Sequence, residues 1–463
     1  MDLTSSFLPL LQEFAQVFTR PTHVTFVALM TGWLLSHRHR YITALIQSSG
    51  CTHPGHHSRY HRFFSHAAWD LDTLCGVLAK LLVATFAPLG LIELAVDDTL
   101  CRKRGLTIYG AGMHHDPLLS SRALKWVSWG HDWVVVCLIV RCFWAPTKVW
   151  CLPILCRLYR NRQGLTKGKK AKGQKAKGRS RRRRRPTDPN HRTRPELARE
   201  MIQLVASWFP GRQFLVSGDS AYGGGSVLQH VPANVDLLSR VAPNAALYAP
   251  APKPVAGQKI NGRPRKKGAR LPGLAAWAAD RTQHWEVLTF DQFGLHATLW
   301  VKTHQALYYK AGKDRLLTIV LVRDPEGKRP DQMFYCTRLD WSASQVLSCY
   351  AHRWAIEVTF ENCKQLLGLE DPANRLPLAV SRTAALALVL YSLVVVWFHR
   401  VGHTWVAFPD RPWYRHKEEP SFADMLSTLR RRSWQERFAG VQLPGGPGEK
   451  ALAQLIDFVS RSG

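Results

Sequence analysis

The stretch LIELAVDDT, Leu91–Thr99, is the part of the sequence that decides the fold. It is a short apolar run typical of a buried β-strand, and it ends in two acids, Asp97 and Asp98. A second such run, QFLVSGD at 213–219, ends in Asp219 just before a glycine-rich turn. Two strands that each end in a carboxylate predict an α/β core in which these acids converge.

The segments around these two strands alternate between helical and strand-like patterns. Apolar residues recur at helical spacing through the first 85 or so residues. The runs WVVVCLIVRCFW and VWCLPILCRLYR, which bracket a turn at Ala145-Pro146, predict two strands. RPELAREMIQLVASWF predicts a helix ahead of the second acid, and Ser342 is a plausible N-cap for a long helix that reaches Leu367.

These patterns predict five parts of the chain. We expect a helical N-terminal domain at 1–88, the first part of the α/β core at 89–232, and a β-rich insertion at 233–340. The last part of the core follows at 341–400, and a helical tail occupies 401–463. Within the core, the segment 164–190 is too charged and too poor in apolar residues to pack, so we expect a disordered loop there.

Charge is the first indication of a partner. The formal net charge is +30, and Lys167–Arg185 alone holds six lysines, six arginines and no acid. The rest of the chain is still strongly basic without that segment, so the folded body should itself attract a polyanion. Nucleic acid is the favoured partner, and a merely soluble basic protein is the alternative.

Cysteine usage and hydropathy favour a cytoplasmic protein with no membrane span. The ten cysteines form no CxxC pair, and most lie in apolar runs, where a cysteine acts as a small hydrophobic residue. The N-terminus lacks the basic start and cleavage site of a secretion signal. The run Thr383–Phe398 is shorter than the roughly 20 residues that span a bilayer, so it predicts a buried core helix.

Three acids suggest a metal site. Asp97 and Asp219 end strands, and Glu357 lies in a helix rich in apolar residues, where an unpaired carboxylate would be costly to bury. Carboxylates that converge in this way can bind two divalent cations roughly 4 Å apart, and oxygen ligands select Mg²⁺ or Mn²⁺. The alternative is that these acids only cap helices and turns.

The helix around Glu357 adds a second pattern. Tyr350, Arg353, Glu357 and Lys364 are spaced so that they follow one stripe of a continuous helix. Such a stripe offers a metal ligand among groups that bind phosphate. The alternative is an ordinary ion pair between Arg353 and Glu357.

Tyr-x2-Arg-x3-Glu-x6-Lys resembles the Y-R-E-K signature of DDE transposases of the bacterial insertion-sequence-four clan. Asp97-Asp98-Thr99, followed by Lys103 and Gly105, is similar to the first-acid motif of that clan's seven-hundred-and-one group, although Leu100 and Cys101 replace its Gly-Phe. Asp219-Ser-Ala-Tyr222-Gly223 resembles the second-acid motif of the same group.

This resemblance implies a ribonuclease-H-like catalytic core interrupted by a β-rich insertion. It also implies that Asp97, Asp219 and Glu357 form the catalytic triad and bind two Mg²⁺ or Mn²⁺ ions, with Asp98 as an alternative first ligand. Tyr350, Arg353 and Lys364 would hold double-stranded DNA near the metals, and Lys103 is a further candidate for phosphate contact. The protein would act as a homodimer on terminal inverted repeats, in the bacterial nucleoid.

Three further features extend the expected DNA contacts. The basic run is a candidate DNA-tracking loop, with Arg181, Arg182, Arg183, Arg184 and Arg185 as contacts and a solvated connector as the alternative. Arg263 and Arg265 lie in a stretch similar to the GRP core of AT hooks. The histidine-rich link near Arg59 and Arg62 favours phosphate contacts in a helix-turn-helix-like segment over zinc, because no finger spacing matches.

The resemblance does not extend to a hairpin step. Several clan members stack a flipped base on a Trp of the insertion, but Met333 or Phe334 occupies the aligned position here.

The sequence also leaves two other functions as alternatives. One is a non-catalytic DNA-binding protein derived from a transposase, and the other is a ribonuclease-H-fold nuclease without strand transfer.

Overall fold

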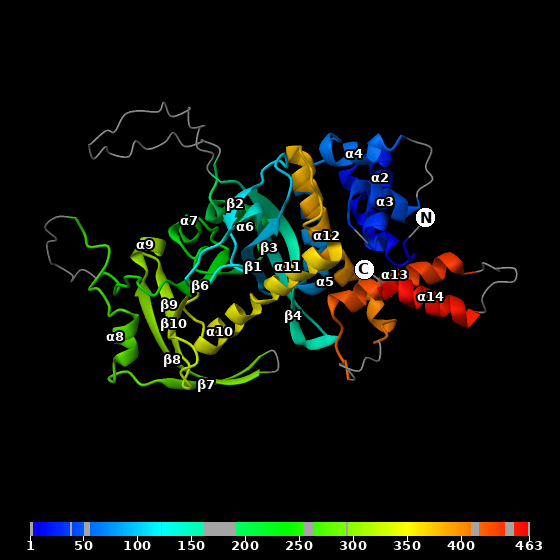
Figure 1. Ribbon diagram of the computed structural model, residues 1–463. Coiled ribbons are helices and arrows are strands. Elements are labelled where there is room, and N and C mark those ends of the chain that lie inside the picture. Colours follow the sequence, from blue (N-terminus) through cyan, green and yellow to red (C-terminus); the bar gives the residue numbers. More distant parts are fainter. Residues whose placement is uncertain are drawn as a thin grey trace, which may run out of the picture.

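The protein is built around one large mixed β-sheet with helices packed around it, as a computed structural model shows (Figure 1). The structure describes residues 3–37, 39–50, 56–121, 123–161, 191–252, 263–292, 295–408, 416–439 and 449–461. The α/β class predicted from the sequence is therefore confirmed.

The sheet has ten strands in the order β2-β3-β1-β5-β6-β10-β9-β8-β7, and β4 pairs with β3 beside this path. The strands are β1 (Ile92–Arg102), β2 (Gly112–His115), β3 (Val127–Cys142), β4 (Ala145–Tyr159), β5 (Phe214–Gly218), β6 (Val235–Val241), β7 (Glu286–Gln292), β8 (Leu295–Leu307), β9 (Leu316–Arg323) and β10 (Gln332–Cys336).

Strand direction brings Asp97 and Asp219 side by side, although the prediction that Asp97 ends its strand is wrong because β1 continues in pairing with β3 to Arg102. β1 and β5 run parallel, β6 is parallel to β5, and β3 is antiparallel to both β1 and β4. Val96 of β1 lies opposite Gly218 of β5, so the next residues, Asp97 and Asp219, are neighbours across the pair. Adjacent strands are about 4.8 Å apart, which is close enough for two carboxylates to influence each other.

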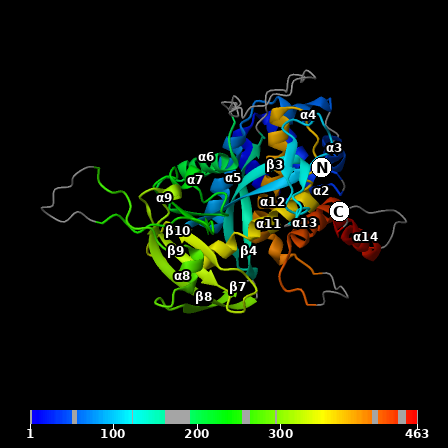
Figure 2. The same cartoon turned by 60° about the vertical axis from the view of Figure 1, so that its left-hand side comes forward.

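The strand-rich segment 233–340 continues the same sheet. Its first strand, β6, pairs with β5, and β10 pairs with β6, so that β9, β8 and β7 extend the sheet outward. Figures 1 and 2 show β7–β10, with α8 (Leu274–Ala279) and α9 (Tyr309–Gly312), at one end of the molecule and the N-terminal helices at the other.

Helices occupy the two ends of the described chain and cover the sheet. The N-terminal set is α1 (Leu8–Gln12), η1 (Glu13–Val17), α2 (Arg20–Leu35), α3 (Ile42–Ser49), α4 (Ser58–Ser65) and α5 (Leu71–Phe86). The later helices are α6 (Arg194–Ser207), α7 (Gly225–Leu228), α10 (Ala343–His352), α11 (Ala355–Leu367), α12 (Pro377–Arg400), η2 (Gly402–Thr404), α13 (Phe422–Phe438) and α14 (Glu449–Arg461).

The helix α12 is the apolar centre of the helical half. Within the described residues, α12 is the one helix that is both long enough and apolar enough to cross a membrane. However, 94% of its most apolar 18-residue stretch is buried inside the protein. It packs against α4, α5, α11, α13 and β4. The predicted role of Thr383–Phe398 as a buried core helix is therefore confirmed.

A buried arginine ties α12 to the N-terminal helices. The Arg382 guanidinium donates to the carbonyls of Phe63, Phe64, Ala67 and Trp69, and it lies 4.1 Å from the centre of the Trp69 ring. Burial lowers the pKa of Arg382. One side chain thus satisfies the carbonyls at the end of α4 and in the turn that follows.

Replacing Arg382 with methionine should destabilise the protein by about 3 kcal/mol, because buried carbonyls lose their donor while the apolar stem is kept. The urea midpoint of unfolding measures this loss. The matched control is Arg400→Met at the exposed C-terminal end of the same helix, which should change stability by less than about 1 kcal/mol. Equal losses in the two variants would contradict the assigned role of Arg382.

Candidate active site

Three predicted acids come together around one arginine. Arg353 forms an ion pair with the Asp97 carboxylate, and its Nη2 lies 4.0 Å from Oε1 of Glu357. Asp219 follows β5 directly beside Asp97, and its negative charge acts on both Asp97 and Arg353. The structure therefore gathers acids from β1, β5 and α11, three elements far apart in the sequence.

Burial makes this group of acids energetically demanding. Burial raises the pKa of Asp97 to about 7, with further upward contributions from the charges of Asp98 and Asp219, and Arg353 only partly opposes the shift. Burial also raises the pKa of Glu357. Asp97 and Asp219 are half-buried and Glu357 is exposed. A divalent cation beside Asp97 would stabilise the charged form that burial disfavours.

The helix that carries the predicted stripe is not continuous. α10 ends at His352 and α11 begins at Ala355. Between them the amide of Arg353 donates to the carbonyl of Tyr350 (3.2 Å), and that of Glu357 donates to the carbonyl of Trp354 (3.1 Å). These three-residue hydrogen bonds tighten the backbone as in a 3₁₀ turn. The expectation of one straight stripe is therefore wrong.

The break has two consequences for the site. Arg353 lies at the break itself, and its buried side chain reaches Asp97 in the middle of β1. Glu357 falls in the first turn of α11, where the helix dipole favours a negative charge. Ser342 caps the start of α10, as predicted, through a reciprocal pair of hydrogen bonds with Gln345.

The other residues of the predicted signature have different surroundings. Tyr350 is buried, its ring centre lies 4.6 Å from that of Phe334, and burial raises its pKa while Arg353 opposes the rise. The Lys364 ammonium donates to the carbonyl of Leu100 (2.8 Å). Tyr350 therefore lies beside Arg353 and Asp219, whereas Lys364 holds the last part of β1 against α11.

Lys103 is also occupied by the protein. Its ammonium donates to the carbonyls of Glu370 (2.6 Å) and Pro372 (3.0 Å), and burial lowers its pKa. In this structure Lys103 ties β1 to the chain that follows α11. A phosphate contact for Lys103 stays a prediction.

Asp98 points to the opposite face of the sheet from Asp97, as neighbouring strand residues do. The Tyr222 hydroxyl donates to Oδ1 of Asp98 (2.5 Å), and Arg194 of α6 lies 3.4 Å from its other oxygen. Arg194 also forms an ion pair with buried Asp132 of β3. Burial raises the pKa of Asp98 to about 6, and the charge of Asp132 adds to the rise.

The sequence did not single out Asp132 or Arg194. An acid inside the apolar run HDWVVVC was the available signal for Asp132, since an acid there requires a partner. Its partner lies 62 residues later, at the start of α6. Nothing in the spacing of the two residues indicates that they meet.

The loop after β5 is held tightly against its neighbours. The Ser239 hydroxyl donates to the carbonyl of Asp219 (2.7 Å), and the Tyr335 hydroxyl donates to the carbonyl of Gly223 (2.9 Å). A Cβ at Gly223 would lie 2.2 Å from the Ser239 hydroxyl, so only glycine fits there. With the bond from Tyr222 to Asp98, these contacts fix Asp219 relative to β1.

The remaining predicted DNA contacts lie away from the acids or outside the described residues. Arg181, Arg182, Arg183, Arg184 and Arg185, and residues 51–55 of the histidine-rich link, lie outside the described residues, and the rest of the link leads into α4. Arg263 and Arg265 are exposed in the connection between β6 and α8. Arg59 donates to the Thr25 hydroxyl, which gives it a structural contact.

Another group of potential metal ligands, more closely spaced than Asp97, Asp219 and Glu357, lies beneath α10. Within the part of the chain that the structure describes, Glu93, Cys349 and His352 hold ligand atoms within 4.8 Å of one another. The Arg141 guanidinium already lies 3.0 Å from Nε2 of His352, and Nδ1 of that ring lies 3.1 Å from the Glu93 carboxylate. This arrangement is an arginine–histidine–glutamate network that anchors α10 to β1 and β3.

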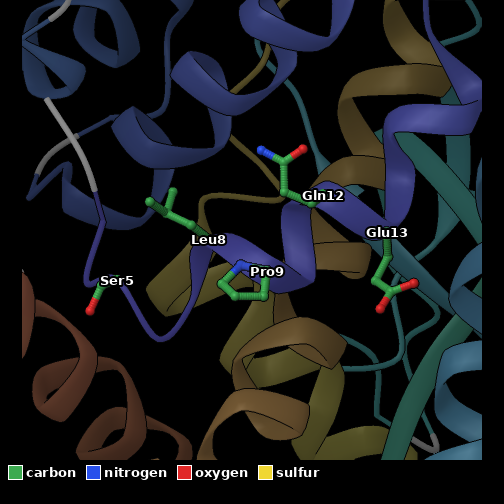
Figure 3. Close-up of a pocket in the computed structure, with 5 residues that line it drawn as sticks. All are labelled: Ser5, Leu8, Pro9, Gln12 and Glu13. Carbon is green, nitrogen blue, oxygen red and sulfur yellow. The ribbon is translucent and has the colours of Figure 1, made fainter.

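A surface hollow on the N-terminal helices offers no comparable chemistry. Ser5, Leu8, Pro9, Gln12 and Glu13 line it, all from one segment of chain (Figure 3). It holds a single acid, and Glu13 has no second carboxylate beside it in the lining. The acid group at β1, β5 and α11 is the stronger candidate for a catalytic centre.

One comparison with known proteins bears on this site. The family model described as DDE superfamily endonuclease matches residues 13–306, well over half of the chain. The matched range includes Asp97 and Asp219 and ends before the helix that carries Glu357. A search of curated proteins finds none that matches the chain.

The raised pKa of Asp97 predicts a pH-dependent response to metal. Because the folded pKa (about 7) exceeds the ordinary value of 3.8, the stability that this group contributes is present below about pH 4 and is lost as the pH rises through 7. Mn²⁺ should therefore raise the thermal unfolding temperature more at about pH 8 than at about pH 5.5, where protons compete. Asp97→Asn should remove this difference between the two pH values. If Mn²⁺ raises the unfolding temperature of the unmodified protein equally at both pH values, the prediction is wrong.

Tyr222→Phe should weaken metal binding without unfolding the protein, because the loop that carries Asp219 loses its bond to β1. The Mn²⁺ concentration that gives half of the thermal shift should rise roughly threefold to tenfold. The control is Thr337→Val, which removes a hydroxyl that donates to the Asp236 carboxylate (2.6 Å) in the same sheet. If both variants shift the titration equally, the effect is general destabilisation and the assignment fails.

Proposed function

Because the chain belongs to the DDE superfamily of endonucleases, we propose that it is a DNA transposase of the insertion-sequence-four clan, closest to the seven-hundred-and-one group. Family membership implies a metal-dependent nuclease whose substrate is DNA. The observation that carries the finer proposal is the meeting of Asp97, Asp219 and Glu357 around Arg353. The Y-R-E-K signature supports the same assignment.

We propose a ribonuclease-H-like core for this enzyme. Support comes from three neighbouring parallel strands, β1, β5 and β6, with the antiparallel strands β3 and β4 on the other side of β1. Acids follow the paired stretches of the first two parallel strands, and the third acid comes from a helix. In this proposal the N-terminal helices bind DNA.

The donor set suits hard divalent cations. Asp97, Asp219 and Glu357 offer only carboxylate oxygens, the ligands that Mg²⁺ and Mn²⁺ prefer, and we propose that they hold two such ions. When bound, the ions would lower the barrier to phosphodiester cleavage by activating the attacking oxygen and stabilising the leaving one. The fit rests on the position of Asp97 and Asp219 side by side on neighbouring strands, and on the Arg353 guanidinium that lies by Asp97 and Glu357 in this structure.

The chain's own residues position the substrate. Arg353 and Tyr350 lie beside the acids, so they can hold the phosphate next to the scissile bond. With the ions bound, the Arg353 guanidinium would be partly released from the carboxylates and could turn to the phosphate. The proposed contacts from Lys364, Lys103, Arg263, Arg265 and the basic run would hold the DNA farther from the scissile bond.

The proposed reaction consists of two displacements at phosphorus. Water attacks the phosphodiester at the transposon end, a new P–O bond forms, and the old P–O bond breaks to release a 3′-hydroxyl. That hydroxyl then attacks a phosphodiester of the target DNA, and the target's own 3′-oxygen leaves. The chain would carry out both steps as a homodimer on terminal inverted repeats in the nucleoid.

Glu357→Gln should reduce Mn²⁺-dependent plasmid nicking by at least about 10³-fold, because a metal ligand is lost. The matched control is Glu361→Gln, one turn farther along α11, where the exposed carboxylate accepts from Gln365 of the same helix. The control should keep nearly full activity. Full nicking by Glu357→Gln would show that Glu357 is no ligand.

Strand transfer is tested with DNA that flanks the coding sequence, pre-cut to expose 3′-hydroxyl ends, and a supercoiled plasmid target. A transposase should give covalently joined products, which sequencing of the junctions identifies. Nicking without joined products would indicate a nuclease without strand transfer. Binding without nicking or joining would indicate a non-catalytic relative.

A further inference from the structure

The connection from β1 to β3 displays an unusual number of apolar side chains to solvent. We define the apolar loop as residues 104–121 and 123–127, which include β2. Seven of its large apolar side chains are 49–85% exposed, whereas Ile108 is buried, and the seven are Leu106, Met113, Leu118, Leu119, Leu124, Trp126 and Val127. Soluble proteins seldom gather such residues in one exposed segment unless the segment binds a partner.

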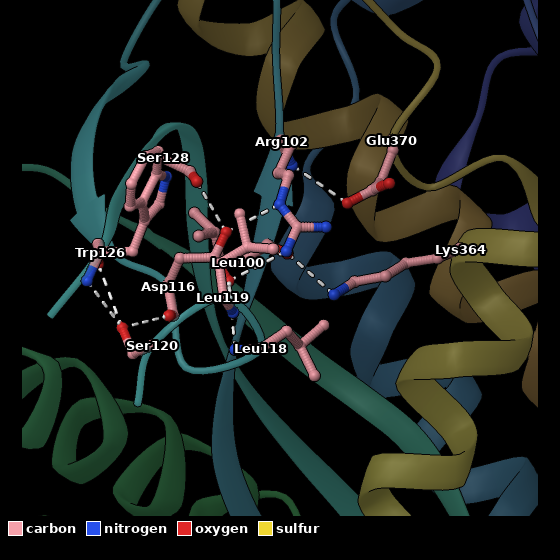
Figure 4. Close-up of polar contacts among 10 residues, drawn as sticks. All are labelled: Leu100, Arg102, Asp116, Leu118, Leu119, Ser120, Trp126, Ser128, Lys364 and Glu370. Carbon is pink, nitrogen blue, oxygen red and sulfur yellow. Dashed lines mark hydrogen bonds and ion pairs between the residues drawn. The ribbon is translucent and has the colours of Figure 1, made fainter. Parts of the chain in front are cut away.

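The tip of this loop has a defined conformation. The buried Asp116 carboxylate accepts from Nε (2.7 Å) and Nη2 (2.9 Å) of Arg102 and from the Ser128 hydroxyl (2.7 Å). The amides of Leu118 (3.2 Å) and Leu119 (3.4 Å) donate to the same carboxylate. Figure 4 shows these contacts converging on Asp116.

Further hydrogen bonds close the loop behind its tip. The Ser120 hydroxyl donates to the carbonyl of Asp116 (2.6 Å) and accepts from the amide of Trp126 (2.9 Å). The amide of Asp116 donates to the carbonyl of Trp126 (2.9 Å). The hydrogen bond from Arg102 lowers the pKa of Asp116 to about 2, so the carboxylate stays charged at neutral pH. This framework holds Leu118 and Leu119, 79% and 55% exposed, in place.

The base of the apolar loop lies near the proposed active site. The loop follows β1, which ends at Arg102. In this last part of the strand, the carbonyl of Leu100 accepts from Lys364 of α11, and the amide of Arg102 donates to the Glu370 carboxylate (3.0 Å). Leu100 is three residues, about 10 Å, beyond Asp97 along the strand. DNA at the acids would therefore pass the loop within about one helical turn of the duplex.

Charge favours DNA over a second copy of the chain as the occupant. Asp116 is the sole acid in the sequence 104–127, and Arg102 neutralises it. Arg104 and Lys125 are exposed beside the apolar side chains. Phosphates would pair with these cations, whereas a symmetric contact between two such loops would bring like charges together.

We propose that Leu118 and Leu119 form an apolar wedge that packs against the bases of DNA held at the active site and unstacks a base step there. The inference rests on the proposed function. Apolar side chains on a rigid support can open a base step, while neighbouring cations hold the backbone on either side. The exposed area that the leucines lose on binding would add affinity that does not depend on salt.

The experiment compares the full chain with the double variant Leu118→Ser/Leu119→Ser. The probe is a 30-base-pair duplex that carries 2-aminopurine, and its affinity is measured by anisotropy across a salt series. The control is Leu89→Ser, which changes a leucine of similar exposure (87%) just before β1, at the opposite end of that strand from the apolar loop. Thermal unfolding checks that all three proteins are equally stable.

The wedge predicts an affinity about tenfold lower for the double variant, with an unchanged slope of log affinity against log salt. It also predicts that the 2-aminopurine fluorescence gained on binding disappears in the double variant and persists in Leu89→Ser. Arg104→Gln/Lys125→Gln should instead reduce the salt slope, because phosphate contacts are lost.

Unchanged affinity and fluorescence in the double variant would overturn the wedge. The wedge would also be overturned if the double variant bound DNA as before but had a smaller particle mass than the unmodified protein in light scattering without DNA. That result would indicate a contact between two copies of the chain. These results differ from failure of the proposed function, in which the unmodified protein would neither bind the duplex nor nick plasmid DNA.

Discussion

The structure of the site depends on one electrostatic constraint, namely that carboxylates from separate elements must share positive charge. In this structure Arg353 supplies that charge to Asp97 and Glu357. The arginine can do so because α10 and α11 are separated by a tight turn, where its buried side chain pairs with Asp97 in the middle of β1. Burial raises the pKa of Asp97 and one guanidinium only partly opposes the rise, so a divalent cation would stabilise the charged form.

A second set of charges on the other face of the sheet keeps the acids in register. Neighbouring residues of a strand point to opposite faces, so Asp97 can face the site while Asp98 bonds Tyr222 and Arg194 behind it. Tyr222 belongs to the same loop as Asp219, so this bond joins the two acid-bearing segments directly. The pair of adjacent acids on β1 therefore has two different tasks, and this gives a physical reason to prefer Asp97 over Asp98 as the ligand.

The sequence predicted the local elements better than their contacts. Apolar runs gave the strands that precede the acids, and hydropathy gave the burial of α12. The break between α10 and α11 could not be predicted, because three-residue and four-residue hydrogen bonds leave nearly the same periodicity in the side chains. The pairing of β10 with β6, the burial of Lys103 and the meeting of Asp132 with Arg194 all depend on residues distant in the chain. The roles of the predicted site residues stay predictions, although the structure brings the three acids together.

The strand β1 connects all of these features, and its order along the chain has a geometric consequence. It carries first Glu93, which anchors α10 through His352, then the acid pair, then Leu100 and Arg102, which fasten its end to Lys364 and Asp116. A strand rises by about 3.3 Å per residue, close to the 3.4 Å rise of a base pair. Since one strand carries both Asp97 and the residues that lead into the apolar loop, the distance between that acid and the base of the loop is set by the strand. DNA that contacts both must therefore adapt its own shape to that distance.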